Sequence, residues 1–378
     1  MIVKNEAHVI ERCLESVKPL ITHWIISDTG STDGTQEKIK EYLKDVPGIL
    51  IETPWKDFGY NRTKVMEEGR SFFKELDHSN SYFLIIDADD TIQINSKEFK
   101  LTDDLYDLKI EDGDTIYNRP HLLKLSVPFY FKDVIHEYID ADVTFSSDSL
   151  FSLIYKRIGG GSRSNNPEKY LKDVEILKQE LLKDPTNSRY MFYLGQSCKD
   201  AGLLEEALIT FDKRSKMEGW DEETWIALYE AAQLAVTLDF SLSEIFQRYL
   251  HIFEVRPTRA EPLYELARFC RLREKFHLAF LFAAAALQVP IPTNDQLFID
   301  IAMYKWKILD EYAISAYWCG FKEISLKSNQ KLLDDGFLPE NEIARIKDNL
   351  QFSLWIKEKE LLKKLVAPLY EETIVISK

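Results

Sequence analysis

Apolar and polar positions alternate in two different ways along this chain, and the pattern changes near residue 167. Before it, short apolar runs alternate with segments in which apolar residues recur at helical spacing, as strands and helices do in turn. The apolar runs predict strands at Met1–Val3, Trp24–Ser27, Ile49–Glu52 and Tyr82–Ile86, and the periodic segments predict helices over Glu6–Val17, through Ile39, Tyr42 and Leu43, and over Asn61–Leu76. Because this order requires crossover connections, it predicts a mainly parallel sheet with helices on both faces.

The fourth predicted strand ends abruptly in carboxylates, in the run Tyr82-Phe-Leu-Ile-Ile-Asp-Ala-Asp-Asp90. Ligands of an open α/β sheet gather at the carboxyl ends of its strands, and Asp28 follows the second strand in the same way. Asp87, Asp89 and Asp90 would repel one another unless a cation joined them. Mg²⁺ and Mn²⁺ bind carboxylate oxygens together with phosphate oxygens, so the pattern predicts a metal site for a diphosphate. A solvated acidic turn is the alternative.

Three segments of the first part together resemble family 2 glycosyltransferases of the GT-A fold. They are Met1-Ile-Val-Lys-Asn-Glu6, Asp28-Thr-Gly-Ser-Thr-Asp-Gly-Thr35 and Asp87-Ala-Asp-Asp90, in this order and spacing. The resemblance implies a nucleotide-diphospho-sugar donor, with a UDP-sugar expected, an inverting transfer, and Mn²⁺ or Mg²⁺ held by the acidic motif.

The resemblance also assigns roles to single residues. Asp28 matches a carboxylate that accepts a hydrogen bond from the base, and Arg62 matches a position near the nucleotide or its phosphates, with a plain surface charge on a helix as the alternative. The expected nucleotide pocket comprises Val3, Asn5, Glu6, Asp28, Arg62, Asp87, Ala88 and Arg163, and the expected metal ligands are Asp87, Asp89, Asp90 and His136.

The segment Val127–Tyr138 predicts a further strand, and its pair His136-Glu137 resembles the V-H-E motif of a bacterial branch of the same family. An inverting transfer needs a carboxylate to take the proton of the attacking acceptor, which makes Glu137 the expected base. Asp133 and Asp142 are its rivals. Since neighbouring strand residues point to opposite faces, His136 joins Glu137 in the site only if the strand bends. A half-buried structural histidine is the alternative.

A glycine-rich segment, Arg157-Ile-Gly-Gly-Gly-Ser-Arg-Ser-Asn-Asn166, closes the first part. It predicts either an interdomain linker or a loop in which Ser162 and Arg163 cover the donor diphosphate. The expected organisation is a GT-A domain over residues 1–160, a linker or active-site loop over 161–169 and a helical domain over 170–378.

The second part shows helical periodicity and an internal repeat. The offsets among Leu194, Gly195, Cys198, Ala207, Phe211 and Arg214 recur 72 residues later in Leu266, Ala267, Cys270, Ala279, Ala283 and Ala286. That shift is close to two tetratricopeptide units of ~34 residues, so the segment resembles such repeats, with a degenerate copy over Glu222–Pro257 and a fainter one over Met303–Leu333. Small residues at fixed offsets let paired helices approach closely, so Cys198 and Cys270 are expected in the core.

Composition narrows the possibilities. A formal charge of −15 and a pI near 5.1 argue against nucleic acid and anionic membrane as partners. No apolar stretch reaches about 18 residues and no signal-like segment opens the chain, so the sequence predicts neither a transmembrane span nor a secretory signal. Its 4 cysteines form no CxxC pair, which favours a reducing, cytoplasmic location without a disulfide framework.

The sequence as a whole therefore predicts an α/β nucleotide-diphospho-sugar transferase domain of GT-A type followed by an all-α tetratricopeptide-like domain. The expected function is metal-dependent transfer of a sugar to a glycan or protein acceptor, with the helical domain positioning the acceptor. One alternative is a binding scaffold with an inactive sugar-nucleotide domain. Another is a nucleotidyl- or phosphotransferase, which the lack of a P-loop disfavours.

Overall fold

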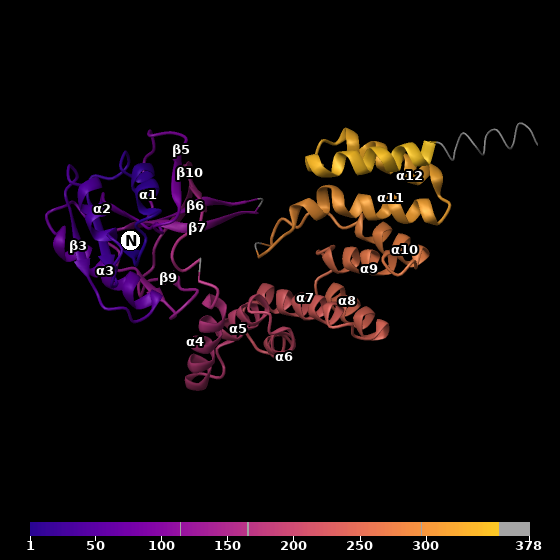
Figure 1. The fold of residues 1–378 in the computed structure, drawn as a ribbon, viewed down its shortest axis with the longest axis horizontal. Helices are drawn as coiled ribbons and strands as arrows, with labels where there is room; N and C mark the ends of the chain where they lie inside the picture. The colour runs from indigo at the N-terminus through magenta and orange to yellow at the C-terminus, as the bar shows by residue number, and fades with distance from the viewer. Residues whose placement is uncertain (114, 165, 296, 355–378) are drawn as a thin grey trace, which may run out of the picture. The chain divides into compact units, whose positions relative to one another are not determined.

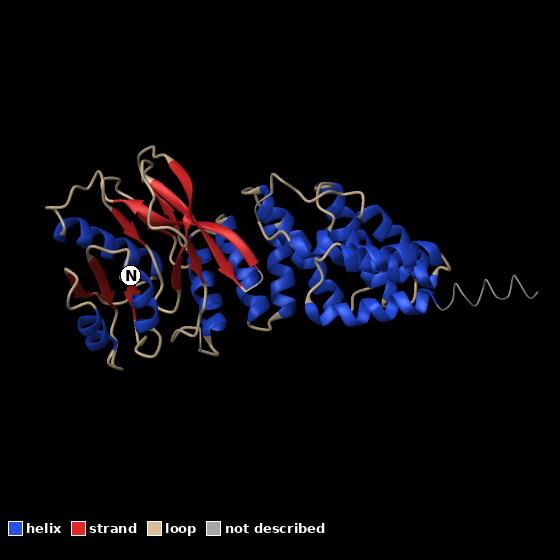
Figure 2. Cartoon of the chain, turned by 90° about the horizontal axis from the view of Figure 1, so that it is seen from above, coloured by secondary structure: helices blue, strands red, loops and turns tan. Residues whose placement is uncertain are grey.

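The computed structural model describes residues 1–113, 115–164, 166–295 and 297–354. The chain divides into two compact units, the first over Met1–Gln179 and the second from Glu180 onward. The division falls inside helix α4 (Lys169–Lys183). Strands occur in the first unit, whereas the second is built of helices (Figures 1 and 2).

The first unit opens with the predicted alternation of strands and helices. Its elements are β1 (Ile2–Val3), α1 (Ile10–Val17), β2 (Trp24–Asp28), α2 (Thr35–Tyr42), β3 (Gly48–Glu52), α3 (Phe58–Phe72) and β4 (Tyr82–Leu84). Strands β1, β2 and β3 form a parallel sheet in which Asp28 pairs with Val3 on one side and with Glu52 on the other. The carboxyl ends of these strands therefore meet at one edge of the sheet.

Helices cover both faces of the parallel sheet, as predicted. Side chains alternate along β2, so Ile25 and Ile26 face opposite sides. Ile26 packs with Ile10 of α1 and Ile39 of α2 in one buried cluster. Ile25 faces α3, where a Cβ on Gly69 would lie 3.3 Å from it, so glycine permits the close approach of helix and sheet.

Five strands, β4 among them, form a second sheet, which the sequence did not predict. It has the order β4-β7-β6-β10-β5, with β5 (Thr91–Ile94), β6 (Leu105–Asp112), β7 (Thr115–Lys124) and β10 (Ser147–Lys156). Strand β4 pairs antiparallel with β7, and only β6 and β10 run parallel among its neighbouring pairs. The parallel arrangement thus holds for β1–β3, while β4 joins the long hairpin of β6 and β7.

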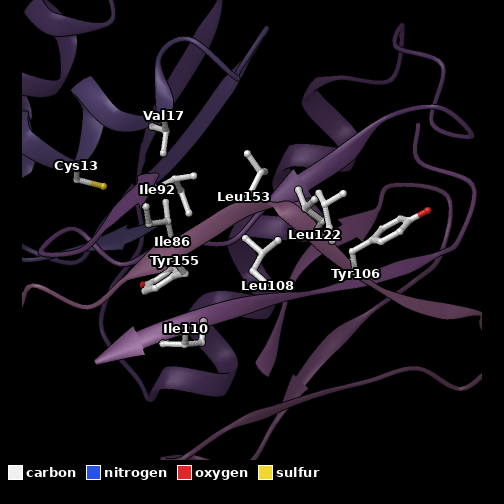
Figure 3. Close-up of a cluster of buried hydrophobic side chains, with 11 residues drawn as sticks. Cys13, Val17, Ile86, Ile92, Tyr106, Leu108, Ile110, Leu122, Leu153 and Tyr155 are labelled. Carbon is white, nitrogen blue, oxygen red and sulfur yellow. The ribbon is translucent and has the colours of Figure 1, made fainter. Parts of the chain in front are cut away.

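A hydrophobic cluster joins the second sheet to α1 (Figure 3). Cys13 and Val17 of α1 pack with Ile86, which precedes the acidic turn, and with Leu108 and Tyr155 of the second sheet. These side chains are at most 4% exposed. The chain just before Asp87 is therefore anchored in a core rather than in a surface loop.

The predicted strand Val127–Tyr138 is instead a hairpin, so this prediction was wrong. Strand β8 (Tyr130–Lys132) pairs antiparallel with β9 (Tyr138–Asp140). Between them, Asp133 and His136 have positive φ angles of 78° and 55°. Such angles are compatible with a turn and incompatible with an extended strand. The turn removes the alternation that would have sent His136 and Glu137 to opposite faces.

The second unit consists of antiparallel helix pairs. Its helices are α5 (Ser188–Asp200), α6 (Leu204–Arg214), α7 (Asp221–Thr237), α8 (Leu242–Val255), α9 (Glu261–Arg271), α10 (Phe276–Ala286), the π-helical turn η1 (Met303–Lys307) continued by α11 (Ile308–Trp318), and α12 (Lys322–Asp334), with residues 340–354 also helical. The predicted spacing of 72 residues superposes α5 on α9 and α6 on α10 in sequence, and Cys198 and Cys270 are buried as expected.

Small residues hold these pairs together. A Cβ on Gly195 in α5 would lie 2.7 Å from the ring of Phe211 in α6, so only glycine allows the observed distance between the two helices. In the second pair, Ala267, Ala279 and Ala283 are fully buried at the corresponding contact. The repeat predicted from these offsets is thus a packing device. No helix within the described ranges is long and apolar enough to span a membrane.

Candidate functional site

The acidic turn Asp87–Asp90 is held from several sides. The Tyr155 hydroxyl of β10 donates to Asp90 Oδ2 (2.8 Å) and accepts from the Asp87 N–H (3.2 Å), so it joins both ends of the turn. From α1, Cys13 Sγ donates to Asp87 O (3.3 Å), and Arg12 donates to the carbonyl of Asp89. The positions of these carboxylates are therefore fixed by elements distant in sequence.

Arg62 links the acidic turn to the β8–β9 hairpin. Its Nη2 lies 2.6 Å from Asp87 Oδ1, and its Nε lies 2.8 Å from Glu137 Oε1. The Arg62 and Glu137 side chains are only 12% and 10% exposed, whereas Asp87 is 46% exposed. Burial by itself would raise the pKa of Asp87, but the charge and hydrogen bond of Arg62 outweigh it and hold that pKa below its ordinary value.

Local sequence explains why Arg62 reaches both acids. Asp57 caps α3 by accepting from the Tyr60 N–H (2.7 Å), which starts the helix and places Arg62 in its second turn. Thr63 Oγ1 accepts from the Phe131 N–H (2.8 Å), which ties the same turn of helix to β8. The Arg62 guanidinium also lies over the Phe131 ring, 5.6 Å from its centroid.

The three candidate bases lie in different surroundings. Glu137 is joined through Arg62 to Asp87. Asp142 is exposed and accepts from the Tyr130 hydroxyl (3.0 Å) at the far side of the hairpin. Asp133 lies at the positive-φ bend that opens the turn. Of these carboxylates, Glu137 is the one that Arg62 joins to the acidic turn.

The expected set of four metal ligands does not come together. Within the described ranges, no group of three or more His, Cys, Asp or Glu side chains is arranged to hold a metal ion. Asp90 is 4% exposed, and its Oδ1 accepts from the N–H groups of Ile158 (3.0 Å) and Gly159 (3.3 Å) while Oδ2 accepts from Tyr155. We therefore assign Asp90 to holding the turn, and His136 to the hairpin bend.

Asp87 and Asp89 nevertheless fit a hard cation. Asp87 uses Oδ1 for Arg62 and Asp89 uses Oδ2 for the Gly161 N–H (3.0 Å), while the second oxygen of each has no hydrogen bond to any described residue. Mg²⁺ is commonly held by one or two carboxylates and takes its other ligands from phosphates and water. Two open carboxylate oxygens match that need, although they do not match a site made of protein ligands alone.

The glycine-rich segment lies directly on the acids. Besides the contacts to Asp89 and Asp90, the Ser162 N–H donates to both oxygens of Glu6 (3.2 Å each). A Cβ on Gly161 would lie 2.7 Å from Asp89 Oδ2, so any other residue there would force the Asp89 carboxylate to shift. His8 Nε2 bonds to the carbonyl of Gly160 (2.8 Å). The segment thus lies within the site and does not merely connect two domains.

The loops after β1 and β2 interlock beside the acidic turn. The Asn5 N–H donates to Ser31 Oγ (2.9 Å), and Asn5 Oδ1 accepts from the Thr32 N–H (2.8 Å). The Glu6 N–H donates to Thr35 Oγ1 (2.8 Å). Asn5 has a φ of 58°, a conformation that asparagine tolerates better than most residues. The two loops that the sequence assigned to the nucleotide pocket therefore form one surface.

Asp28 contributes an unsatisfied acceptor to this region. Its Oδ1 accepts from the N–H groups of Gly30 (2.8 Å) and Ser31 (2.7 Å). Its Oδ2 is buried without a hydrogen-bond partner among the described residues. A buried carboxylate oxygen without a donor is costly, so a ligand N–H that reached it would relieve that cost.

The other expected pocket residues have mixed surroundings. Val3 and Ala88 are buried in one cluster, at 3% and 5% exposure, so they can offer a ligand only their backbone. Arg163 forms an ion pair with the buried Asp173 of α4 and lies over the Phe58 ring, 4.6 Å from its centroid. These two contacts occupy Arg163.

This chain is similar to known glycosyltransferases. The family model described as glycosyl transferase family 2 matches residues 1–98. The first unit carries a family 2 glycosyltransferase domain. The chain is also 26% identical over 227 residues to the SPbeta prophage-derived glycosyltransferase SunS of Bacillus subtilis strain 168 and to the glycosyltransferase SunS of Bacillus phage SPbeta. That alignment covers 55% of this chain and 50% of each relative, so the chain spans about half the length of the curated relatives it matches.

Solved structures similar to this chain include helical repeat proteins. The crystal structure of MamA is 14% identical, covers 50% of this chain and 98% of its own, and has a TM-score of 0.37. The C-terminal part of a TPR repeat-containing protein from Cytophaga hutchinsonii is 12% identical, covers 55% of this chain and 74% of its own, and has a TM-score of 0.41. The tetratricopeptide-like assignment of the second unit rests on its own helix pairs and their spacing.

Sequence analysis missed several residues that shape the family 2 domain. Tyr155 and Arg12 position the acidic turn, and His121 packs against the Tyr155 ring with 4.2 Å between centroids. Burial lowers the pKa of His121 to about 4, partly offset by its hydrogen bond to Ile85 O, so it is neutral at pH 7. In the sequence, His121 and Tyr155 are only polar side chains next to apolar neighbours, a pattern that by itself does not indicate a site.

Glu6 gives the family 2 domain a predicted pH dependence. Burial raises the pKa of Glu6 from 4.5 to about 7; the charge of Asp89 adds to this, against the hydrogen bond from Ser162. Because the pKa of Glu6 is higher in the folded state, its contribution to stability is fully present below about pH 4.5 and is lost as the pH rises through 7. In EDTA, Glu6→Gln should therefore melt increasingly above wild type between pH 4.5 and 8, as measured by circular dichroism.

The matched control is Glu41→Gln, because Lys44 lowers the pKa of this exposed carboxyl. It should show no such gain at high pH. A difference between Glu6→Gln and wild type that is the same at every pH would contradict the burial of an ionisable Glu6.

Proposed function

We propose that this chain is a metal-dependent inverting glycosyltransferase that moves a sugar from a UDP-sugar to a glycan or protein acceptor. The observation that carries the proposal is the Arg62 bridge between Asp87 and Glu137. Through this one guanidinium, Asp87, which could bind a metal–diphosphate, is joined to Glu137, which could act as the catalytic base. The match of residues 1–98 to a family of sugar transferases supports it.

The donor would bind across the interlocked loops. The unsatisfied Asp28 Oδ2 suits the ring N–H of a pyrimidine base such as uracil. The open oxygens of Asp87 and Asp89 suit a divalent cation, which when bound neutralises the charge that develops on the departing diphosphate. Asp89 would then hold the cation through Oδ1 while Oδ2 accepts from the Gly161 N–H.

Glu137 would act as the base. The acceptor lone pair forms the new bond to the anomeric carbon while the bond to the diphosphate breaks on the opposite side, and the acceptor proton passes to the Glu137 carboxylate. Arg62 holds Glu137 in place through Nε, and the hairpin bend at His136 lets the side chain point toward the acidic turn. An inactive binding scaffold would not need this arrangement of Asp87, Arg62 and Glu137.

The acceptor would bind in the second unit. A groove of about 790 Å³ lies there, lined mainly by α7, α9, η1, α11 and the helical residues 340–354. Pairs between alternate helices brace it, such as Tyr229 of α7 with Glu265 of α9 (3.2 Å) and Arg271 of α9 with Glu311 of α11 (2.6 Å). Trp306 adds an aromatic surface from the π-helical turn, a type of distortion that is frequent at functional sites. This volume is in the range that holds small ligands or a few residues of a peptide.

The first prediction tests the metal. Asp89→Ala should abolish turnover and remove the metal-dependent part of UDP affinity, because too few oxygens remain to hold the ion. Isothermal titration calorimetry with UDP, in Mn²⁺ and in EDTA, measures that part directly. Asp148→Ala, an exposed carboxylate of β10, is the control and should match wild type. Equal UDP affinity in Mn²⁺ and EDTA for wild type would overturn the metal assignment.

The second prediction tests the base. Glu137→Gln should keep donor affinity and lower transfer by about 10²–10⁴-fold, the usual contribution of general-base catalysis. Asp142→Asn is the control, since Asp142 is exposed and accepts from the Tyr130 hydroxyl of the hairpin. UDP release in the presence of acceptor gives both rates. A normal rate for Glu137→Gln would reject the role, and a loss confined to Asp142→Asn would transfer it.

The third prediction tests the groove. Trp306→Ala should raise the KM for the acceptor and leave slow donor hydrolysis unchanged, because the residues proposed to bind the donor lie in the first unit. Trp220→Ala is the matched control, an exposed tryptophan that does not line the groove. An unchanged acceptor KM for Trp306→Ala would argue that the groove does not bind the acceptor.

A further inference from the structure

The diphosphate of a donor needs positive charge beyond that of one cation, and most arginines near the acidic turn are already engaged. Arg62 is shared between Asp87 and Glu137, and Arg163 is paired with Asp173. Arg12 donates to backbone carbonyls of Asp89 and Gly159. Arg62, which the family resemblance places near the nucleotide or its phosphates, is therefore already paired with carboxylates of the protein.

The pairing of β4 with β7 brings another arginine to the same place. The antiparallel register sets Phe83 opposite Leu123 and Leu84 opposite Leu122. It continues through the hydrogen bond from the Ile85 N–H to His121 O (2.8 Å). The His121 ring also bonds to the carbonyl of Ile85 (2.7 Å), so these two residues are held together at the end of β4. Asp87 and Arg119 each lie two residues beyond this contact, Asp87 after Ile85 and Arg119 before His121.

Arg119 differs from its neighbours in being exposed and unpaired. It forms no ion pair or hydrogen bond with the residues that the structure describes. Its charge nevertheless acts on the site. Against burial, which raises the pKa of Asp87, Arg119 helps to lower that pKa alongside the larger effect of Arg62, and it adds to the effect of burial in lowering the pKa of His121. The contact of Ile85 with His121 and this electrostatic effect both place Arg119 near Asp87.

We propose that Arg119 binds the diphosphate of the donor and stabilises it as the leaving group. A planar guanidinium can donate two hydrogen bonds to one phosphate, which an engaged Arg62 cannot do. Asp87 then serves both sides of the site, since it holds Arg62 through Oδ1 and faces the metal–diphosphate with its other oxygen. This inference rests on the proposed function, because it presumes a nucleoside-diphosphate donor.

The test compares a nucleoside diphosphate with its nucleoside on the full chain. UDP, GDP, ADP, CDP and dTDP are first screened by thermal shift with Mn²⁺, and the strongest ligand and its nucleoside are then titrated by calorimetry. Arg119→Ala should weaken the diphosphate by about 10- to 100-fold, the size expected when hydrogen bonds to a charged group are lost, and leave the nucleoside unchanged. Arg119→Lys should recover part of the loss, since it restores charge without the bidentate geometry.

The matched control is Lys44→Ala, which removes an exposed cation next to α2 that is already paired with Glu41 (2.7 Å). It should bind both ligands as wild type does. Because Arg119 is exposed and unpaired, Arg119→Ala should keep the wild-type melting temperature.

Each outcome decides a different point. If Arg119→Ala keeps the full preference for diphosphate over nucleoside, the role of Arg119 is overturned while the proposed function stands. If no nucleoside diphosphate shifts the wild type, the proposed function fails and this inference with it. If the nucleoside and diphosphate weaken equally, Arg119 supports the pocket as a whole, and diphosphate binding by Arg119 is rejected.

Discussion

The site depends on one buried guanidinium. Arg62 lies between two carboxylates from distant parts of the chain. Removing either carboxylate would leave part of the charge of the buried Arg62 side chain uncompensated. This requirement fixes the distance between the acidic turn and the β8–β9 hairpin, because both must reach the same side chain of α3. The requirement also explains why an arginine expected to serve the nucleotide serves the protein first.

The negative charge of the acidic turn is also compensated by backbone groups. Backbone N–H groups of the glycine-rich segment donate to Asp89, Asp90 and Glu6, so these carboxylates are partly compensated before any cation binds. A Cβ on Gly161 would lie 2.7 Å from Asp89 Oδ2, so glycine lets the segment come this close without moving that carboxylate. The Gly161 N–H uses only Oδ2 of Asp89, which leaves Oδ1 without a hydrogen bond to the described residues.

Local patterns were predicted well, and long-range pairings were not. The order of β1 to β4 and the 72-residue repeat follow from the periodicity of neighbouring residues, so sequence alone contains them. The pairing of β4 with β7 joins residues about 40 positions apart, and no local pattern encodes it. The hairpin bend at His136 was missed because apolar residues on both sides imitate one strand. The partners of Arg62 and the open state of Arg119 depend on these pairings, so they too required the structure.

Charged side chains divide by whether the protein satisfies them. In the second unit, pairs such as Arg271 with Glu311 and Arg345 with Asp310 join alternate helices, so these charges stabilise the groove before any ligand binds. In the first unit, Asp90 and Arg163 are satisfied in the same manner and therefore act in structure. Asp28 Oδ2 is buried without a hydrogen-bond partner among the described residues, whereas Arg119 is exposed to solvent and forms no ion pair with them. A buried acceptor without a donor costs stability, and a ligand N–H that reached Asp28 Oδ2 would remove that cost. An exposed guanidinium is hydrated and carries no such cost, so Arg119 can remain open without destabilising the fold.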